Sequence, residues 1–253
     1  MTFAWCGSCT VLVDSRFFWV ALVAALAGLV RGFSGFGAAL IFVPLGGMVY
    51  DAKTAVLLLW IVDGCGALPF LPPHLRRARW QEVVPLVIGS TIAMPAGVWI
   101  LTHGDPYWLR WAVSGVVLLS TLALASGWRY HRAASLGMTI SVGGAAGLSS
   151  GAVGIGGPPL VLFWLGGQAN AAQARSNIFA YFAVTTLTAM AAYLWQGILT
   201  PAIVLLGLAL VPIYVAALFA GDRVFRHSGE TGFRRMAFWL CGLAAILGMP
   251  VWN

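Results

Sequence analysis

Apolar residues along this chain form long runs that are separated by short polar segments. A transmembrane helix needs about 20 apolar residues, and runs near or above that length cover 17–50, 54–71, 82–102, 107–128, 136–166, 176–196, 201–219 and 236–252. The longest polar loop, residues 221–235, is too short to fold alone. The pattern predicts an all-α, polytopic transmembrane helical bundle, with residues 1–253 as a single integral membrane domain.

Composition and charge agree with a membrane protein. The chain is 60% hydrophobic and 8% charged, whereas a soluble domain carries about 25% charged residues. The net charge of +7 does not indicate nucleic-acid binding, because the arginines cluster at the ends of apolar runs, as in cytoplasmic loops of membrane proteins. We therefore expect the lipid bilayer, and no nucleic acid, as a partner. The clusters are Arg76, Arg77 and Arg79; Arg129 and Arg132; and Arg223, Arg226, Arg234 and Arg235.

The cysteines give no sign of a metal site. Cys6 and Cys9 form a C-x-x-C motif, but no second pair with zinc-ligand spacing follows. Cys65 and Cys241 lie in apolar runs, where cysteine behaves as a small hydrophobic residue. We expect no metal and no cofactor. A cleaved signal peptide is also not expected, because no positive charge precedes Arg16.

The chain resembles itself at an offset of 119 residues. The segment "AGLVRGFSGFG" (27–37) matches "AGLSSGAVGIG" (146–156) with six identities in eleven positions. We interpret this as a duplication, with residues 10–130 as the first repeat and 131–253 as the second. A glycine-rich interruption at matching places in two halves indicates the binding site of a secondary transporter.

The two runs that contain these glycines are unusually long for single spans. As straight helices, 17–50 and 136–166 would measure about 45–50 Å, so we expect each to be a helical hairpin or a broken helix. If each returns to its own side, the basic loops at 72–81, 129–135 and 221–235 are all cytoplasmic. The halves are then inverted, and both termini face outward. Eight simple spans remain the alternative.

Glycine-rich breaks inside a membrane have two interpretations. They allow helices to pack closely, or they free backbone groups that line a cavity. Pro158 and Pro159 follow the second break and suit the first turn of a helix, whose N-terminus would attract an anion. We therefore predict a substrate site for a small anion that contains Arg31, Ser34, Gly35, Gly37, Ser149, Ser150, Gly154, Gly156, Gly157 and Asn177.

Two charged residues lie within apolar runs rather than at their ends. Arg31 falls at the first break and Asp63 midway along 54–71, and charges inside a bilayer are usually functional. Arg31 is a candidate to bind the anion, and Asp63 is a candidate to carry a coupling proton. The alternative is a structural ion pair between them. In the second half, Ser150 and Phe182 occupy the matching positions.

An enzyme is the hypothesis from another class. "GFSG" (32–35) is similar to the nucleophile motif of rhomboid intramembrane proteases, whose chemistry needs a base within hydrogen-bond reach of the serine. His74, His103, His131 and His227 all fall in predicted loops or at span ends. We therefore predict no catalytic residues and no enzyme activity.

The two glycine motifs also carry a family resemblance. "RGFSGFGAALIFVPL" (31–45) and "GLSSGAVGIGGPPLVLFWL" (147–165) resemble the TauE/SafE sulfite exporter family, also described as the toluene sulfonate uptake permease family. The resemblance implies a carrier in the inner membrane of a prokaryote for sulfite, organosulfonates or similar anions. The first motif has Gly35–Phe36–Gly37–Ala38 where the second has Gly154–Ile155–Gly156–Gly157.

Together these observations predict a secondary membrane transporter, and the family resemblance implies that it exports small sulfur-containing anions. The chain has no nucleotide-binding motif, so we expect coupling to protons through Asp63 and alternating access around the glycine breaks. A passive anion channel is the alternative. The sequence leaves a homo-oligomer open.

Overall fold

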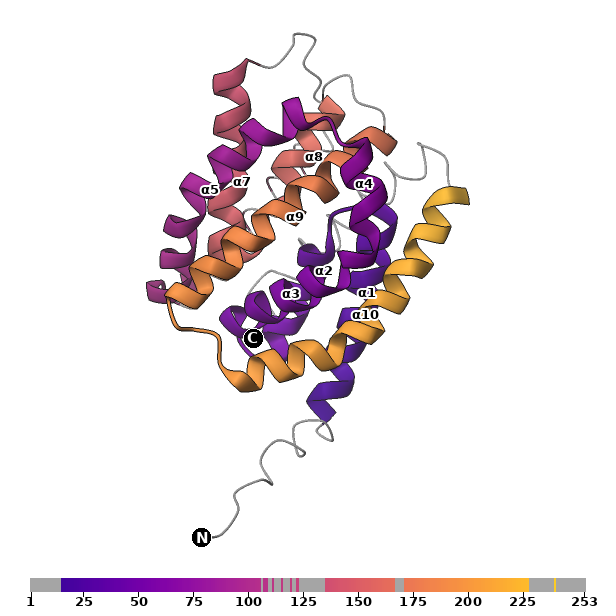
Figure 1. The fold of residues 1–253 in the computed structure, drawn as a ribbon. Coiled ribbons are helices and arrows are strands. Elements are labelled where there is room, and N and C mark those ends of the chain that lie inside the picture. Colours follow the sequence, from indigo (N-terminus) through magenta and orange to yellow (C-terminus); the bar gives the residue numbers. More distant parts are fainter. Residues whose placement is uncertain are drawn as a thin grey trace.

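A computed structural model describes residues 15–105, 135–166 and 171–227, with a few isolated positions between 107 and 122 and Trp239. Within these residues the regular structure is entirely helical (Figure 1). The helices are α1 (Ser15–Ser34), α2 (Ala38–Val49), α3 (Ala52–Gly66), the 3-10 helix η2 (Leu68–Phe70), α4 (Leu71–Arg77), α5 (Trp80–His103), α7 (Leu136–Val153), α8 (Gly157–Gly166), α9 (Ala171–Trp195) and α10 (Pro201–His227).

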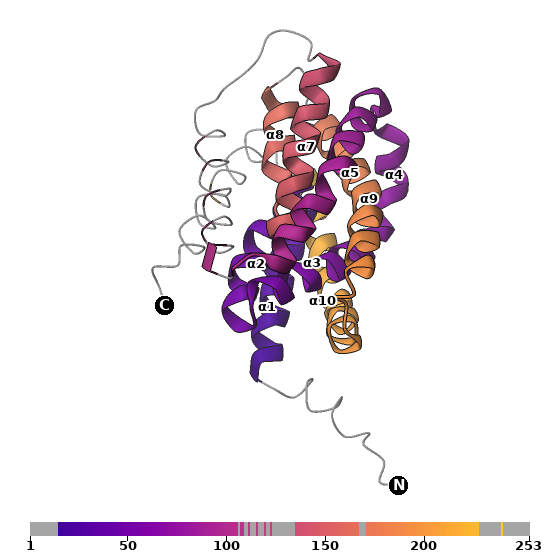
Figure 2. The ribbon, with the colours of Figure 1, turned by 90° about the vertical axis from the view of Figure 1, so that its left-hand side faces the viewer.

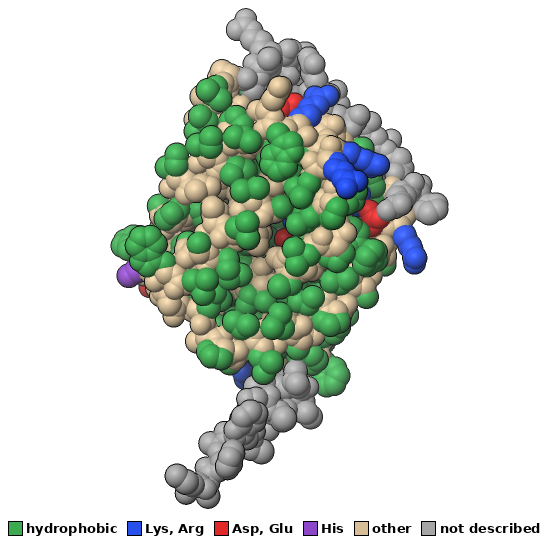
Figure 3. Space-filling view, in the orientation of Figure 1, with side chains coloured by type: hydrophobic (Ala, Val, Ile, Leu, Met, Phe, Trp, Pro, Cys, Tyr) green, Lys and Arg blue, Asp and Glu red, His purple; other side chains and the backbone are tan. Residues whose placement is uncertain are grey.

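Six helical segments of the described residues are long and apolar enough to cross a membrane. They are Arg16–Ser34, Ala52–Arg77, Trp80–His103, Leu136–Val153, Ala172–Trp195 and Pro201–Phe225. This confirms the predicted all-α, multi-pass membrane protein. The predicted spans 107–128 and 236–252 lie almost entirely outside the described residues. Figure 3 shows apolar side chains over most of one face, with basic side chains near the end where α4 meets α5.

Both glycine-rich runs contain a turn between two helices. The backbone of Gly35, Gly37 and Gly154 has φ of 77°, 91° and 72°, a left-handed conformation that glycine adopts at little cost. Gly156 follows Ala146 by ten residues, which a straight helix would spread over about 15 Å. A Cβ placed on Gly156 would nevertheless lie only 2.8 Å from the carbonyl oxygen of Ala146. The chain therefore folds back after α7, and Figure 2 shows α8 beside α7. In the structure each of these two runs holds two helices joined by a glycine turn.

Other glycines bring pairs of helices into backbone contact. A Cβ on Gly32 of α1 would lie 2.0 Å from the carbonyl oxygen of Leu218 in α10. A Cβ on Gly89 of α5 would lie 2.0 Å from the carbonyl oxygen of Ile140 in α7. Small residues permit such close approach in membrane proteins. In Figure 1 the α1–α10 and α5–α7 pairs lie on opposite sides of the molecule, with α9 between them. Gly32 and Gly89 therefore allow close helix packing, whereas Gly35, Gly37 and Gly154 turn the chain.

Two predicted boundaries were wrong. The loop expected at 221–235 begins as helix, because α10 continues to His227. The span expected at 176–196 begins earlier, at Ala171. In both places the apolar run ends near a charged residue, Asp222 or Arg175. The two side chains instead pair with each other inside the bundle, which removes the reason for the helices to end there. The duplication and the inverted orientation of the halves remain predictions.

Candidate functional site

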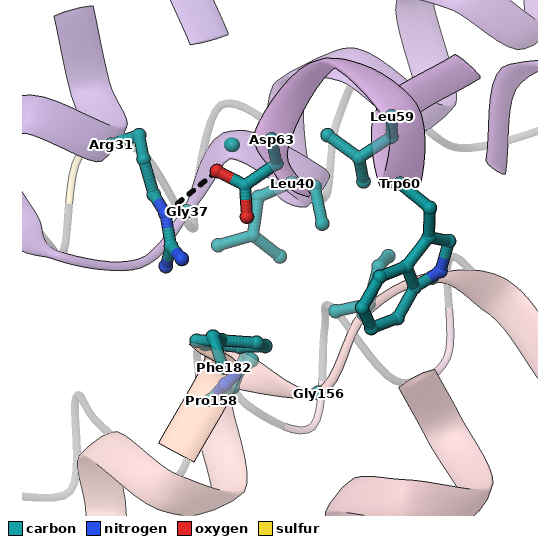
Figure 4. A pocket seen from close by; sticks show the side chains of 14 residues that line it. Arg31, Gly37, Leu40, Leu59, Trp60, Asp63, Gly156, Pro158 and Phe182 are labelled. Atoms are coloured by element: carbon teal, nitrogen blue, oxygen red, sulfur yellow. Dashed lines mark hydrogen bonds and ion pairs between the residues drawn. The ribbon is translucent and has the colours of Figure 1, made fainter. Parts of the chain in front are cut away.

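A pocket lies where the two glycine turns meet α3 and α9 (Figure 4). The first turn and α2 contribute one part of its lining, and the second turn and the start of α8 contribute another. The lining residues are Arg31, Gly37, Ala38, Ala39, Leu40, Leu59, Trp60, Asp63, Gly154, Ile155, Gly156, Gly157, Pro158 and Phe182. Segments more than a hundred residues apart in sequence therefore build one site.

The guanidinium of Arg31 is the cationic group of this pocket. Arg31 is 2% exposed, so it faces the interior of the bundle and not the lipid. Its Nε donates a 2.9 Å hydrogen bond to Oδ1 of Asp63, and its Nη1 donates to the carbonyl oxygen of Gly35. The rings of Phe179 and Phe182 lie 5.0 and 4.6 Å from its Cζ. Such aromatic faces stabilise a buried cation.

Asp63 is held by two partners through the same oxygen atom. Besides the bond from Arg31, Oδ1 accepts a 2.5 Å hydrogen bond from the hydroxyl of Tyr214 in α10. The Asp63 side chain is 13% exposed, and Figure 4 shows its second oxygen directed toward the open part of the pocket. The ion pair that the sequence left as an alternative therefore exists. Sequence reasoning missed Tyr214, whose one signal was a polar hydroxyl within the apolar run 201–219.

The N-termini of two helices reach this pocket. Gly37 is the N-cap of α2 and Ala38 its first residue, and Gly157 and Pro158 begin α8. All four residues line the pocket. The unpaired N–H groups of a helix's first turn carry a partial positive charge and favour anions. Arg31 and these two N-termini bring positive charge to the pocket, and the carboxylate of Asp63 brings negative charge to it.

The structure brings together Arg31, Gly37, Asp63, Gly154, Gly156 and Gly157 around the pocket. Among the other predicted ligands, Ser34 and Ser149 bond backbone carbonyl oxygens of their own helices, those of Val30 at 2.8 Å and Ala145 at 2.9 Å. The remaining partners of the Ser34 hydroxyl in the described residues are backbone groups of Phe36. Among the described residues, no base lies within hydrogen-bond reach of the Ser34 hydroxyl. The geometry therefore does not favour the serine-protease alternative.

Three further predicted ligands lie beside the pocket or away from it. Gly35 packs on the side chain of Arg175, to which a Cβ would come within 2.7 Å. Ser150 is buried behind Gly156, and its hydroxyl has no hydrogen-bond partner among the described residues. Asn177 accepts 2.9 Å hydrogen bonds from the Arg79 backbone and the Gln173 side chain and donates to Glu82. The Asn177 amide therefore joins α9 to the start of α5 instead of lining the pocket.

A second buried ion pair was not predicted. Nη2 of Arg175 in α9 lies 2.7 Å from Oδ1 of Asp222 in α10, and the two side chains are 5% and 8% exposed. Nη2 also donates to the carbonyl oxygen of Gly32 in α1. Neither residue lines the pocket. Among the described residues, no group of three or more His, Cys, Asp or Glu side chains could hold a metal ion.

Comparison with known proteins identifies one family. Residues 20–248 match the family described as "Sulfite exporter TauE/SafE". The chain is also 27% identical over 226 residues to the "Probable sulfite/organosulfonate exporter TauE" of Cupriavidus necator, an alignment that covers 87% of this chain and 88% of that protein. No solved structure matches the chain.

Proposed function

Because this chain belongs to the sulfite exporter TauE/SafE family, we propose that it exports small sulfur-containing anions, such as sulfite or organosulfonates, across the inner membrane of a prokaryote. The name of the Cupriavidus necator relative supports this substrate class. The observation that carries the proposal is the meeting of the buried Arg31 with two helix N-termini in one pocket. In that arrangement, positive charge faces a bound anion from both glycine turns.

The anion binds to Arg31 through its oxygen atoms. A guanidinium donates two parallel hydrogen bonds to an oxyanion, which orients it as well as attracting it. Leu40, Leu59, Trp60 and Phe182 give the pocket apolar walls, and such walls strengthen electrostatic attraction because they keep water away. The first residues of α2 and α8 then face the remaining negative charge.

Anion binding changes the environment of Asp63. Arg31 already pairs with this carboxylate, so an anion on Arg31 weakens the pair. A buried charge that loses its partner is strongly destabilised, and Asp63 relieves this by taking a proton. The anion and the proton therefore occupy the site together. A divalent anion such as sulfite then crosses with one net negative charge, which an inside-negative membrane potential drives outward.

Alternating access requires that the pocket open to one side of the membrane at a time. In transporters with paired broken helices, part of the bundle rocks around a site at the breaks. The close backbone contacts within the α1–α10 and α5–α7 pairs make each pair a candidate rigid body. Arg31 of α1 and the turn that follows α7 both line the pocket, so a change in the relative orientation of the two pairs would open and close it.

Flux measurements in proteoliposomes test this function. Sulfite flux is measured at a clamped membrane potential, with and without a pH gradient, for the wild type, Asp63→Asn and the control Asp105→Asn, which changes an exposed aspartate. We expect the wild type and the control to follow the pH gradient and Asp63→Asn to lose this dependence. Unlabelled sulfite on the far side should accelerate wild-type flux, as exchange by a carrier requires.

The other results separate the parts of the proposal. Wild-type flux that ignores the pH gradient would contradict proton coupling but leave the anion site. Flux without acceleration by sulfite on the far side would indicate a channel. An absence of flux with sulfite and with a panel of organosulfonates would contradict the proposed substrate class.

A further inference from the structure

The Arg175–Asp222 pair lies against the first glycine turn but outside the pocket. Arg175 is 4% exposed and Asp222 is 6% exposed. A buried ion pair adds little net stability, because removing both charges from water costs about as much as their attraction returns. The contacts of this pair with its surroundings therefore indicate its role better than the attraction between the two charges does.

The two buried arginines hold the same turn from different sides. Arg175 donates to the carbonyl oxygen of Gly32, and Arg31 donates to that of Gly35. Both oxygens lie at the C-terminal end of α1, where helix carbonyls lack partners within the helix and carry partial negative charge. The side chain of Arg175 also packs directly on Gly35. The position of the turn thus depends on Arg175.

One aromatic ring connects the two guanidiniums. The ring centroid of Phe179 lies 5.0 Å from Cζ of Arg31 and 5.5 Å from Cζ of Arg175. The ring of His74 stacks on Phe179 at a centroid distance of 4.4 Å. Phe179 is fully buried, so it cannot shift without moving these neighbours. A change at Arg175 therefore reaches Arg31 both through the turn and through this ring.

We propose that Arg175, aligned by Asp222, is a positioning residue of the anion site: it fixes the first glycine turn and so places the guanidinium of Arg31 in the pocket. This inference rests on the proposed function. Nη2 of Arg175 donates to both Gly32 and Asp222 while the guanidinium lies over the ring of Phe179. A lysine presents one compact charge and no plane that stacks on this ring. Arg175 acts through Arg31 and does not itself touch the anion.

The test uses four variants that separate positioning from folding. Arg175→Met alone leaves Asp222 buried without its cation and is expected to weaken the fold. The double variant Arg175→Met/Asp222→Asn removes both charges and avoids that penalty. Arg175→Lys keeps the charge but removes the guanidinium plane that lies over Phe179. Arg79→Met removes an arginine whose side chain is 58% exposed and serves as the control.

Two measurements are made on each variant. The first is the KM and maximal rate of sulfite flux in proteoliposomes. We expect the double variant to raise KM about tenfold while the maximal rate changes less than about twofold, because Arg175 acts on the placement of the group that binds the anion. Arg175→Lys should fall between the double variant and the wild type, and Arg79→Met should match the wild type.

The second measurement is hydrogen–deuterium exchange, which needs no substrate. Amides of residues 32–38 should exchange faster in the double variant, by about tenfold, since local opening is then easier. Exchange in α5 and α7 should stay unchanged. An unchanged rate at 32–38, or faster exchange throughout the bundle, would overturn the positioning role. An absence of wild-type sulfite flux would contradict the proposed function alone, and the exchange data would still decide the role of Arg175.

Discussion

Replacing Gly143 by alanine tests the close packing of α5 on α7. A Cβ at this position would lie 2.1 Å from the carbonyl oxygen of Leu86 in α5. The next residue, Gly144, is a matched control in the same helix, because the nearest neighbour of its Cβ would be 3.8 Å away. The two substitutions make the same chemical change, so the difference between them isolates the contact with α5.

The structure gives the expected magnitude. Alanine stabilises a helix interior relative to glycine by about 1 kcal/mol, a gain that both variants share. A Cβ does not approach another heavy atom closer than 3.0 Å in practice, so Gly143→Ala forces α5 and α7 apart. Such overpacking costs about 1–3 kcal/mol. We expect Gly144→Ala to gain up to about 1 kcal/mol and Gly143→Ala to be less stable than it by about 1–3 kcal/mol.

Thermal unfolding of the purified protein in detergent measures this difference. For a chain of this size, 1 kcal/mol shifts the midpoint by about 2–4 °C. The Gly143→Ala protein should therefore unfold about 2–12 °C below the Gly144→Ala protein. Equal midpoints, or a higher midpoint for Gly143→Ala, would refute the inference that backbone contact holds these two helices together.

Two further substitutions separate local structure from substrate binding. Ser34→Ala removes a hydroxyl that donates to the carbonyl oxygen of Val30. We expect a loss of about 1 kcal/mol in stability and an unchanged KM for sulfite. A raised KM would instead show that this hydroxyl binds the anion. Asn177→Ala leaves donors of Arg79 and Gln173 without their acceptor; we expect a loss of about 1–3 kcal/mol, again with unchanged KM. A raised KM with unchanged thermal stability would return Asn177 to the binding site.

The features that could be predicted from sequence are those with a local cause. A left-handed backbone at Gly35, Gly37 and Gly154 is a property of each residue alone, so the glycine clusters indicated the two turns. A charge within an apolar run is conspicuous without any knowledge of its neighbours. That reasoning identified Arg31 and Asp63, and the structure places both in one pocket.

Features that depend on a distant partner were missed or misplaced. Tyr214 lies 151 residues from Asp63, and Asp222 lies 47 residues from Arg175. A hydrophobicity pattern carries no information on which side chains meet across such separations. Ser34 and Asn177 were chosen because their side chains suit an oxyanion, but nearby backbone and side-chain groups already occupy them.

Sequence reasoning alone predicted the membrane-spanning helices of the described residues, the two glycine turns and the residues whose charge or backbone conformation required explanation. The tertiary structure decided which of those residues share the pocket, which glycines turn the chain and which lock helices together, and which charges are paired. The reason is the range of the forces involved. Bilayer insertion and backbone strain act on a single segment, whereas ion pairs and close packing exist only after segments far apart in the chain have come together.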